Sequence, residues 1–179
     1  MTTAVMLDLE TLGTRPNCVI MTLGAVKFDP FDSDKEFGSG IYMRMDLEEQ
    51  LALGRTVDDG TIEWWARQDE RVRTEAWEQG DRNSIQDLKR ELNRLLVGVD
   101  EIWCQGPVFD IAILEDLYRS QKWGFPWNFW QIRDSRTLFK VVNYRLESKR
   151  DQAHNALLDC VYQAEAVQNI YRQLKLQPS

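Results

Sequence analysis

Two carboxylates, Asp8 and Glu10, lie two residues apart at the end of a short apolar run. The run, residues 4–9, predicts a β-strand, and side chains two apart on a strand project from the same face. Two buried carboxylates that point the same way repel each other, so their burial makes sense mainly with a cation between them. The spacing alone is weak evidence, because residues 46–48 repeat it by chance in a charged, helix-prone stretch.

A third candidate ligand, Asp110, follows a second predicted strand, and a fourth, Asp159, lies nearer the C-terminus. Residues 101–104 predict a strand that runs into the turn at 106–107, and Asp110 opens the next helix. It could cap that helix, or it could bring a carboxylate to the edge where open α/β sheets place their sites. Asp159 lies on an otherwise apolar helix face, where an unpaired carboxylate would be costly and a metal ligand would not.

The only histidine of the chain, His154, precedes Asp159 by five residues. On one continuous helix that separation would turn the two side chains roughly 140° apart. They can therefore share a site only if His154 lies on the loop or first turn before the helix, which the polar residues 150–152 permit. A lone histidine more often has a structural or surface role, so its position alone does not identify a base.

The elements that must position these side chains begin with three apolar runs, which predict an antiparallel meander of strands at residues 4–9, 18–28 and 37–45. From Asp46 onward the period becomes helical. Ser84 is a predicted N-cap for an apolar stripe that ends at Gly98, and further helices are expected over residues 111–118, 135–144 and 156–174. Strands followed by alternating helix and strand predict an α/β or α+β sheet covered by helices. Without a repeat, low-complexity tract or linker, residues 1–179 are expected to form one domain.

The composition limits the classes of function. A net charge of −7 argues against a protein that coats nucleic acid through many phosphate contacts. A metal-dependent nuclease stays open, because divalent cations can bridge its carboxylates to a few phosphates. The three cysteines form no C-x-x-C pair, so we expect a reducing, cytoplasmic location rather than a disulfide framework or a zinc site. No apolar run approaches the ~20 residues of a membrane span, and the first ten residues lack the basic region of a secretory signal.

The order of these features is more specific than any one of them. With D-x-E on the first strand, an aspartate after a later strand and H-x-x-x-x-D near the C-terminus, the chain resembles the DEDDh superfamily of 3′→5′ exonucleases. It is more similar still to the branch that contains phage exonuclease A and a bacterial 3′→5′ exoribonuclease. The phrases that carry this resemblance are MLDLETLG at 6–13, LGAV at 23–26, EWW at 63–65, RDSRTL at 133–138 and HNALLD at 154–159. Two positions depart from the branch: Gln105 stands where asparagine is expected, and Leu158 where an acidic residue would be unremarkable.

The resemblance implies an α/β, ribonuclease H-like fold: a mixed sheet of an antiparallel N-terminal meander and parallel strands, covered by helices. It implies removal of nucleoside 5′-monophosphates from the 3′ ends of single-stranded DNA or RNA. Two divalent cations would stabilise charge on the attacking and leaving oxygens, and oxygen ligands suit Mg²⁺ or Mn²⁺. By resemblance Asp8 would bridge both ions, Glu10 and Asp159 would complete one ion site, and Asp110 would hold the other. His154 would take the proton from the attacking water.

Four further residues are candidates for substrate contact. Thr11 and Leu12 follow Glu10 directly, and in similar enzymes this segment contacts the last nucleotide. Trp64 and Trp65 could stack on bases, or both could pack in the core. Because neighbouring residues point to different sides of a helix, we expect one tryptophan in the core and one near the substrate.

Two other functions stay open. A proofreading or nucleic-acid-binding module that depends on a partner is disfavoured by the complete signature and by the acidic charge. An internal cutter, such as a ribonuclease H or an integrase, explains the carboxylates but not the His154 run or the EWW phrase. The resemblance also admits a homodimer and suggests a phage or prophage origin.

Overall fold

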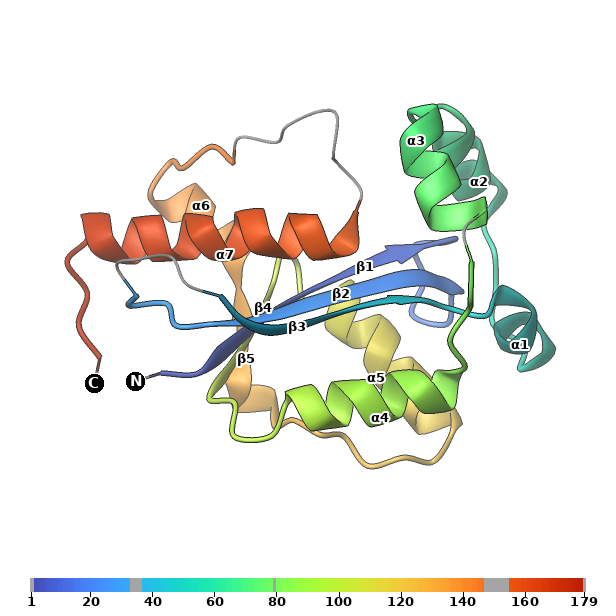
Figure 1. The fold of residues 1–179 in the computed structure, drawn as a ribbon, viewed down its shortest axis with the longest axis horizontal. Helices are drawn as coiled ribbons and strands as arrows, with labels where there is room; N and C mark the ends of the chain where they lie inside the picture. Colours follow the sequence, from blue (N-terminus) through green and yellow to red (C-terminus); the bar gives the residue numbers. More distant parts are fainter. Residues whose placement is uncertain (1, 33–36, 79, 147–154, 179) are drawn as a thin grey trace.

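The computed structural model describes residues 2–32, 37–78, 80–146 and 155–178, and a five-stranded sheet forms its centre (Figure 1). The strands are β1 (Ala4–Thr11), β2 (Ile20–Phe28), β3 (Phe37–Arg44), β4 (Glu101–Cys104) and β5 (Ile132–Asp134). They lie in the order β3-β2-β1-β4-β5. The β1–β2 and β2–β3 pairs are antiparallel, whereas β1–β4 and β4–β5 are parallel. The mixed sheet with an antiparallel N-terminal meander is therefore confirmed.

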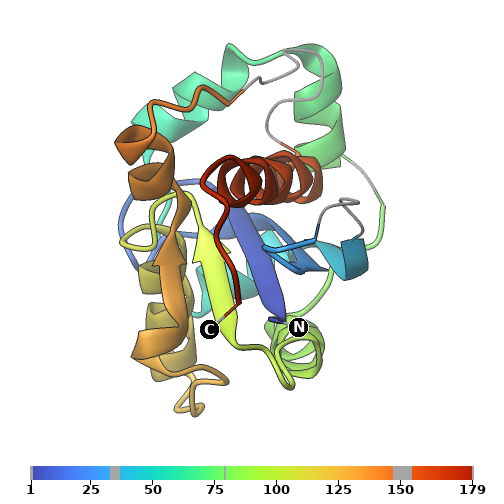
Figure 2. The same cartoon turned by 90° about the vertical axis from the view of Figure 1, so that its left-hand side faces the viewer.

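Helices cover both faces of the sheet. Helix α7 (Ala156–Gln173) crosses one face, and α4 (Ile85–Leu95) and α5 (Asp110–Ser120) lie on the other, as Figure 2 shows with α7 seen end-on. Strand β1 alternates between these layers: Val5, Leu7 and Leu9 belong to the core with α4 and α5, whereas Ala4 and Met6 belong to the core with α7. Helix α6 (Ser135–Val141) contributes Phe139 to the α7 side.

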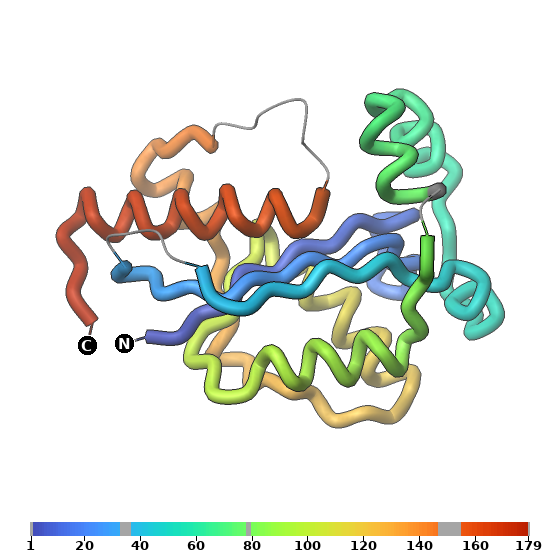
Figure 3. Tube along the Cα trace, viewed as in Figure 1, coloured from blue at the N-terminus to red at the C-terminus, as the bar shows by residue number. Residues whose placement is uncertain are grey.

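The segment between β3 and α4 packs beyond the C-terminal end of β1 (Figure 3). It contains α1 (Leu47–Ala52), α2 (Asp59–Ala66), α3 (Glu70–Arg73) and the π-helical turn η1 (Thr74–Glu78). These elements share a small core of their own around Trp65, to which Leu12 and Met21 contribute. The end of β1 is thus enclosed on one side by helices that follow it in the sequence.

The predicted helices form, but α6 ends at Val141, three residues before the predicted end at residue 144. Ser84 is the N-cap of α4, and its side chain and that of Asp87 form a reciprocal capping box. Helix α7 covers nearly all of the predicted segment 156–174. A 3₁₀ turn, η2 (Phe129–Gln131), leads into β5, a strand that the sequence did not predict. In the part of the chain that the structure describes, no helix has both the length and the apolar character needed to cross a membrane.

Candidate active site

Strand β1 and helix α7 bring three of the predicted metal ligands together. Asp8 and Glu10 continue the row of Ala4 and Met6 on the α7 side of the sheet, as the strand period requires. One carboxylate oxygen from each of Asp8, Glu10 and Asp159 lies within 4.8 Å of the other two. Side chains separated by about 150 residues in the sequence therefore form one acidic cluster.

Close packing at Gly24 sets the position of Asp159. Gly24 lies opposite Asp8 on β2, and a Cβ atom there would stand only 2.2 Å from the carbonyl carbon of Ala156. The thiol of Cys160 also donates a hydrogen bond to the carbonyl oxygen of Gly24, at 3.3 Å. The first turn of α7 thus rests directly on the β2 backbone, and the next residues of the helix carry Asp159 over β1.

The fourth predicted ligand, Asp110, reaches the same region from the opposite layer. It is the first residue of α5 and only 4% exposed. The alternative that it caps this helix is wrong, because Phe109 holds the N-cap position. Instead, Asp110 Oδ1 accepts a hydrogen bond from the backbone N–H of Leu9, at 3.2 Å. Asp110 lies outside the 4.8 Å group, but it is tied to the strand residue between Asp8 and Glu10.

Burial and mutual repulsion dominate the electrostatics of these carboxylates. Burial, followed by the charge of Asp110, raises the pKa of Asp8 well above its usual range. The pKa of Glu10 is raised by burial and then by the charge of Asp159. Burial raises the pKa of Asp110 to about 7, although the hydrogen bond from Leu9 opposes the shift. A cation bound among these carboxylates would oppose the repulsion and favour their charged forms.

One residue of the site was missed by the sequence analysis. Gln163 lies one helical turn after Asp159 and is 3% exposed, and its Nε2 donates to Asp8 Oδ1 at 3.4 Å. A buried amide four residues from a candidate ligand, on an otherwise apolar helix face, is the signal that could have identified it. His154, the predicted base, lies outside the described residues.

A cavity of about 490 Å³ adjoins the acidic cluster at Glu10. Thr11, Trp64, Trp65 and Phe109 also line it. Trp65 is 1% exposed and donates from Nε1 to the carbonyl oxygen of Thr11, whereas Trp64 is 40% exposed. Trp65 is therefore the tryptophan expected in the core, and the contact of Trp64 with substrate stays a prediction. Leu12, 4% exposed, packs in the same small core as Trp65.

Comparison with known proteins identifies the family. Residues 3–171 match the family described as the 3′-5′ exoribonuclease Rv2179c-like domain. The chain belongs to this family. The superfamily expected from the sequence is thereby confirmed, and the chain is a 3′→5′ exonuclease domain.

Individual relatives agree with this assignment. The exonuclease domain is 28% identical over 160 residues to the exodeoxyribonuclease of Enterobacteria phage T4, a match that covers 76% of this chain and 70% of the phage protein. Its fold is similar to that of E. coli ExoI in a zinc-ion-bound complex with single-stranded DNA, with a TM-score of 0.73 and 15% identity over 98% of this chain. ExoI in complex with a dA16 oligonucleotide gives a TM-score of 0.72 at 15% identity. The chain spans only 42% of either ExoI chain, and at 15% identity these similarities concern the fold alone.

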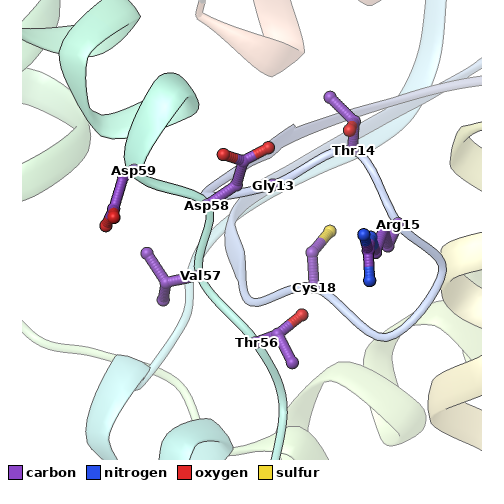
Figure 4. A pocket seen from close by; sticks show the side chains of 8 residues that line it. All are labelled: Gly13, Thr14, Arg15, Cys18, Thr56, Val57, Asp58 and Asp59. Atoms are coloured by element: carbon purple, nitrogen blue, oxygen red, sulfur yellow. The ribbon is translucent and has the colours of Figure 1, made fainter.

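A second cavity of the exonuclease domain adjoins the first. Its volume is about 440 Å³, and the segments 13–18 and 56–59 face each other across it (Figure 4). Gly13, Thr14 and Asp58 line both cavities. Arg55 fixes the 13–18 loop by donating to the carbonyl oxygens of Pro16 and Cys18. Two adjoining cavities therefore lie beside Glu10, and backbone held by Arg55 forms part of their wall.

Proposed function

We propose that this exonuclease domain hydrolyses the terminal phosphodiester bond at the 3′ end of single-stranded nucleic acid and releases nucleoside 5′-monophosphates. The observation that carries the proposal is the convergence of Asp8, Glu10 and Asp159 within 4.8 Å, beside a cavity lined by Glu10. Ligand cavities of proteins commonly measure 300–1,000 Å³, so a volume of about 490 Å³ suits a terminal nucleotide. The bond to be cleaved would lie at the carboxylates and the last nucleoside in the cavity.

The donor set fits two divalent cations, Mg²⁺ or Mn²⁺. All four candidate ligands, Asp8, Glu10, Asp110 and Asp159, offer carboxylate oxygens, which these hard cations prefer. Burial and mutual repulsion raise the pKa of Asp8 and of Glu10, as expected of ligands whose charge is meant to be shared with a cation. When bound, the two cations supply electrostatic stabilisation of the attacking and leaving oxygens.

The chain's own residues position the reactants and move the proton. We assign His154 as the general base that accepts a proton from the attacking water, because the usual pKa of histidine lies near neutral pH. Thr11 and Leu12 would contact the terminal nucleotide, and the accessible ring of Trp64 would stack on a base. Support for the last role comes from the 40% exposure of Trp64 within the wall of the cavity.

The sugar preference is a separate question, because the relatives differ in it. The family description specifies an exoribonuclease, the T4 relative is an exodeoxyribonuclease, and the ExoI structures contain single-stranded DNA. We propose single-stranded 3′ ends of either polymer as the substrate class.

The three cysteines are free and buried, which fits the reducing cytoplasm expected from the sequence.

Digestion of matched 5′-labelled single-stranded DNA and RNA tests the proposal. Each substrate is incubated with Mg²⁺, Mn²⁺ or EDTA and with the wild type, His154→Ala, Asp159→Asn or Glu165→Gln. Glu165→Gln is the matched control, because Glu165 lies on α7 outside the acidic cluster. We expect a metal-dependent ladder that shortens from the 3′ end, lost in the first two variants and kept in the control.

Two further measurements separate the alternatives. Cleavage of circular single-stranded DNA would indicate an internal cutter. Tight metal-free binding without any shortening of linear substrate would indicate a binding or proofreading module, and the proposal would then be withdrawn.

A further inference from the structure

Gln163 is a buried polar side chain whose hydrogen-bonding capacity is only partly used. It is 3% exposed and lies on the α7 face that otherwise packs Cys160, Ala164 and Val167 against the sheet. Its Nε2 donates to Asp8 Oδ1 at 3.4 Å. Within the described part of the chain, its Oε1 is buried and has no hydrogen-bond partner. A buried acceptor without a partner in a native fold calls for an explanation, such as an ordered water or a role in a site.

The chemistry of Asp8 determines which end of the amide faces it. A carboxylate that binds a cation is ionised and can only accept hydrogen bonds, so the amide nitrogen must point toward it. Lysine or arginine at position 163 would donate more strongly, but its positive charge would compete with a divalent cation for the same carboxylate. Glutamine is a donor without charge, so it can orient Asp8 and leave the negative charge of the cluster intact.

We propose that Gln163 is a positioning residue that orients the Asp8 carboxylate for metal binding. The inference rests on the proposed role of Asp8 as a metal ligand. Its geometric basis is the α-helical spacing that puts Gln163 one turn from Asp159, so that one helix face supplies both a ligand and the donor to a second ligand on β1. When metal is bound, an ordered water could donate a hydrogen bond to the Oε1 of Gln163. Hydrogen bonds to metal ligands commonly change metal affinity or activity by about 10- to 100-fold when they are removed.

The same helix offers a matched control. Gln168 is 1% exposed, also has a buried Oε1 without a partner among the described residues, and donates from Nε2 to the carbonyl oxygen of Asp29. It has the same residue type, helix, burial and bonding pattern as Gln163, but its partner is a loop carbonyl rather than a candidate ligand. Substituting either glutamine with methionine keeps a similar volume and removes the amide.

The test is a titration of the EDTA-treated, full-length protein with Mn²⁺ and with Mg²⁺. Metal binding is followed by calorimetry and by the metal-dependent rise in Tm, and nuclease activity is measured at each metal concentration. We expect Gln163→Met to raise the half-saturating metal concentration about 10- to 100-fold, and Gln168→Met to leave it unchanged even if it shifts the Tm. Gln163→Leu serves as the second variant if Gln163→Met does not fold.

The outcomes separate this inference from the proposed function. Normal metal binding by the wild type with equal half-saturating concentrations in the Gln163 and Gln168 variants would overturn the positioning role alone. If the wild type binds no metal and Asp8→Asn gives the same titration, the proposed metal site would be overturned. The positioning role of Gln163 would then be overturned with it. A shift confined to the Gln163 variants would establish the role.

Discussion

Gly24→Ala should disrupt the candidate active site without replacing any of its proposed ligands. The added Cβ would stand 2.2 Å from the carbonyl carbon of Ala156 and 2.3 Å from the amide nitrogen of Leu157. Ordinary contacts of a Cβ begin at 3.4 Å, so the start of α7 must retreat by 3.4 Å less 2.2 Å, about 1.2 Å. The obstacle is backbone on both sides, and no side-chain rotation can relieve it.

The displacement of α7 should lower both the free energy of unfolding and the rate of nucleotide release. Overpacking of a well-packed interior typically costs about 1–3 kcal/mol, because the helix must move away from the sheet that it covers. The same displacement carries Asp159 away from Asp8 and Glu10, whose oxygens now lie within 4.8 Å of its own. A misplacement of about 1 Å can lower a catalysed rate about 100-fold. We therefore expect a loss of that order in the rate of nucleotide release at saturating Mg²⁺.

The assay compares Gly24→Ala with Gly40→Ala on the neighbouring strand. A Cβ at Gly40 would meet the α7 side through the flexible Leu157 Cδ1, at 3.5 Å, and its closest contact would be the carbonyl oxygen of Ala25, at 3.1 Å. Gly40→Ala should therefore lose little activity. Rates are measured with labelled single-stranded DNA at a temperature where urea unfolding shows both variants to be folded. A Gly24→Ala variant that is destabilised but retains the wild-type rate would refute the argument that this contact positions Asp159.

Three further predictions concern other parts of the molecule. Because burial raises the pKa of Asp110 to about 7, the metal-free fold binds more protons than the unfolded chain between about pH 4 and 7. Stability in EDTA should then fall as pH rises through that window, and thermal melts of Asp110→Asn should show a smaller fall. Gln50→Leu should cost about 2–6 kcal/mol in urea unfolding, since the Gln50 amide pairs with both the N–H and the C=O of Ile20 and each unmet group costs about 1–3 kcal/mol; an unchanged midpoint would contradict this. Trp64→Ala should raise the KM for single-stranded substrate about 5- to 150-fold if the ring stacks on a base, worth about 1–3 kcal/mol, and an unchanged KM would exclude stacking.

Features encoded by local chemistry were predictable from the sequence. The strand period put Asp8 and Glu10 on one face, and their place at the end of an apolar run located the site at the end of β1. Ser84 was identified as an N-cap because capping depends on residues only three positions apart. The order of the carboxylates along the chain then identified the superfamily, which the family comparison confirms.

Features that arise from contacts between distant segments were not predictable in this way. Strand β5 has only three residues, Ile132–Asp134, and two of them are charged, so it has no apolar pattern; its pairing with β4 defines it. The sequence could not show that α7 packs on the backbone of Gly24. A side chain is excluded there by Ala156, which lies far away in the sequence. Gln163 has a local signal, its place four residues after Asp159 on an apolar helix face, but its partner Asp8 lies 155 residues away and could not be named from the sequence.

The acidic charge of the chain and its proposed activity are consistent once the cluster is considered as part of the folding energetics. Buried carboxylates that raise one another's pKa reduce the stability of the metal-free fold near neutral pH. A cation that binds only the folded state raises the free energy of unfolding. At concentrations above Kd, this increase grows with the logarithm of the cation concentration. An exonuclease that binds one terminal phosphodiester through cations needs few basic side chains on its surface. A net charge of −7 is therefore compatible with the proposed activity. The same reasoning predicts that the domain depends on divalent cations for stability as well as for turnover.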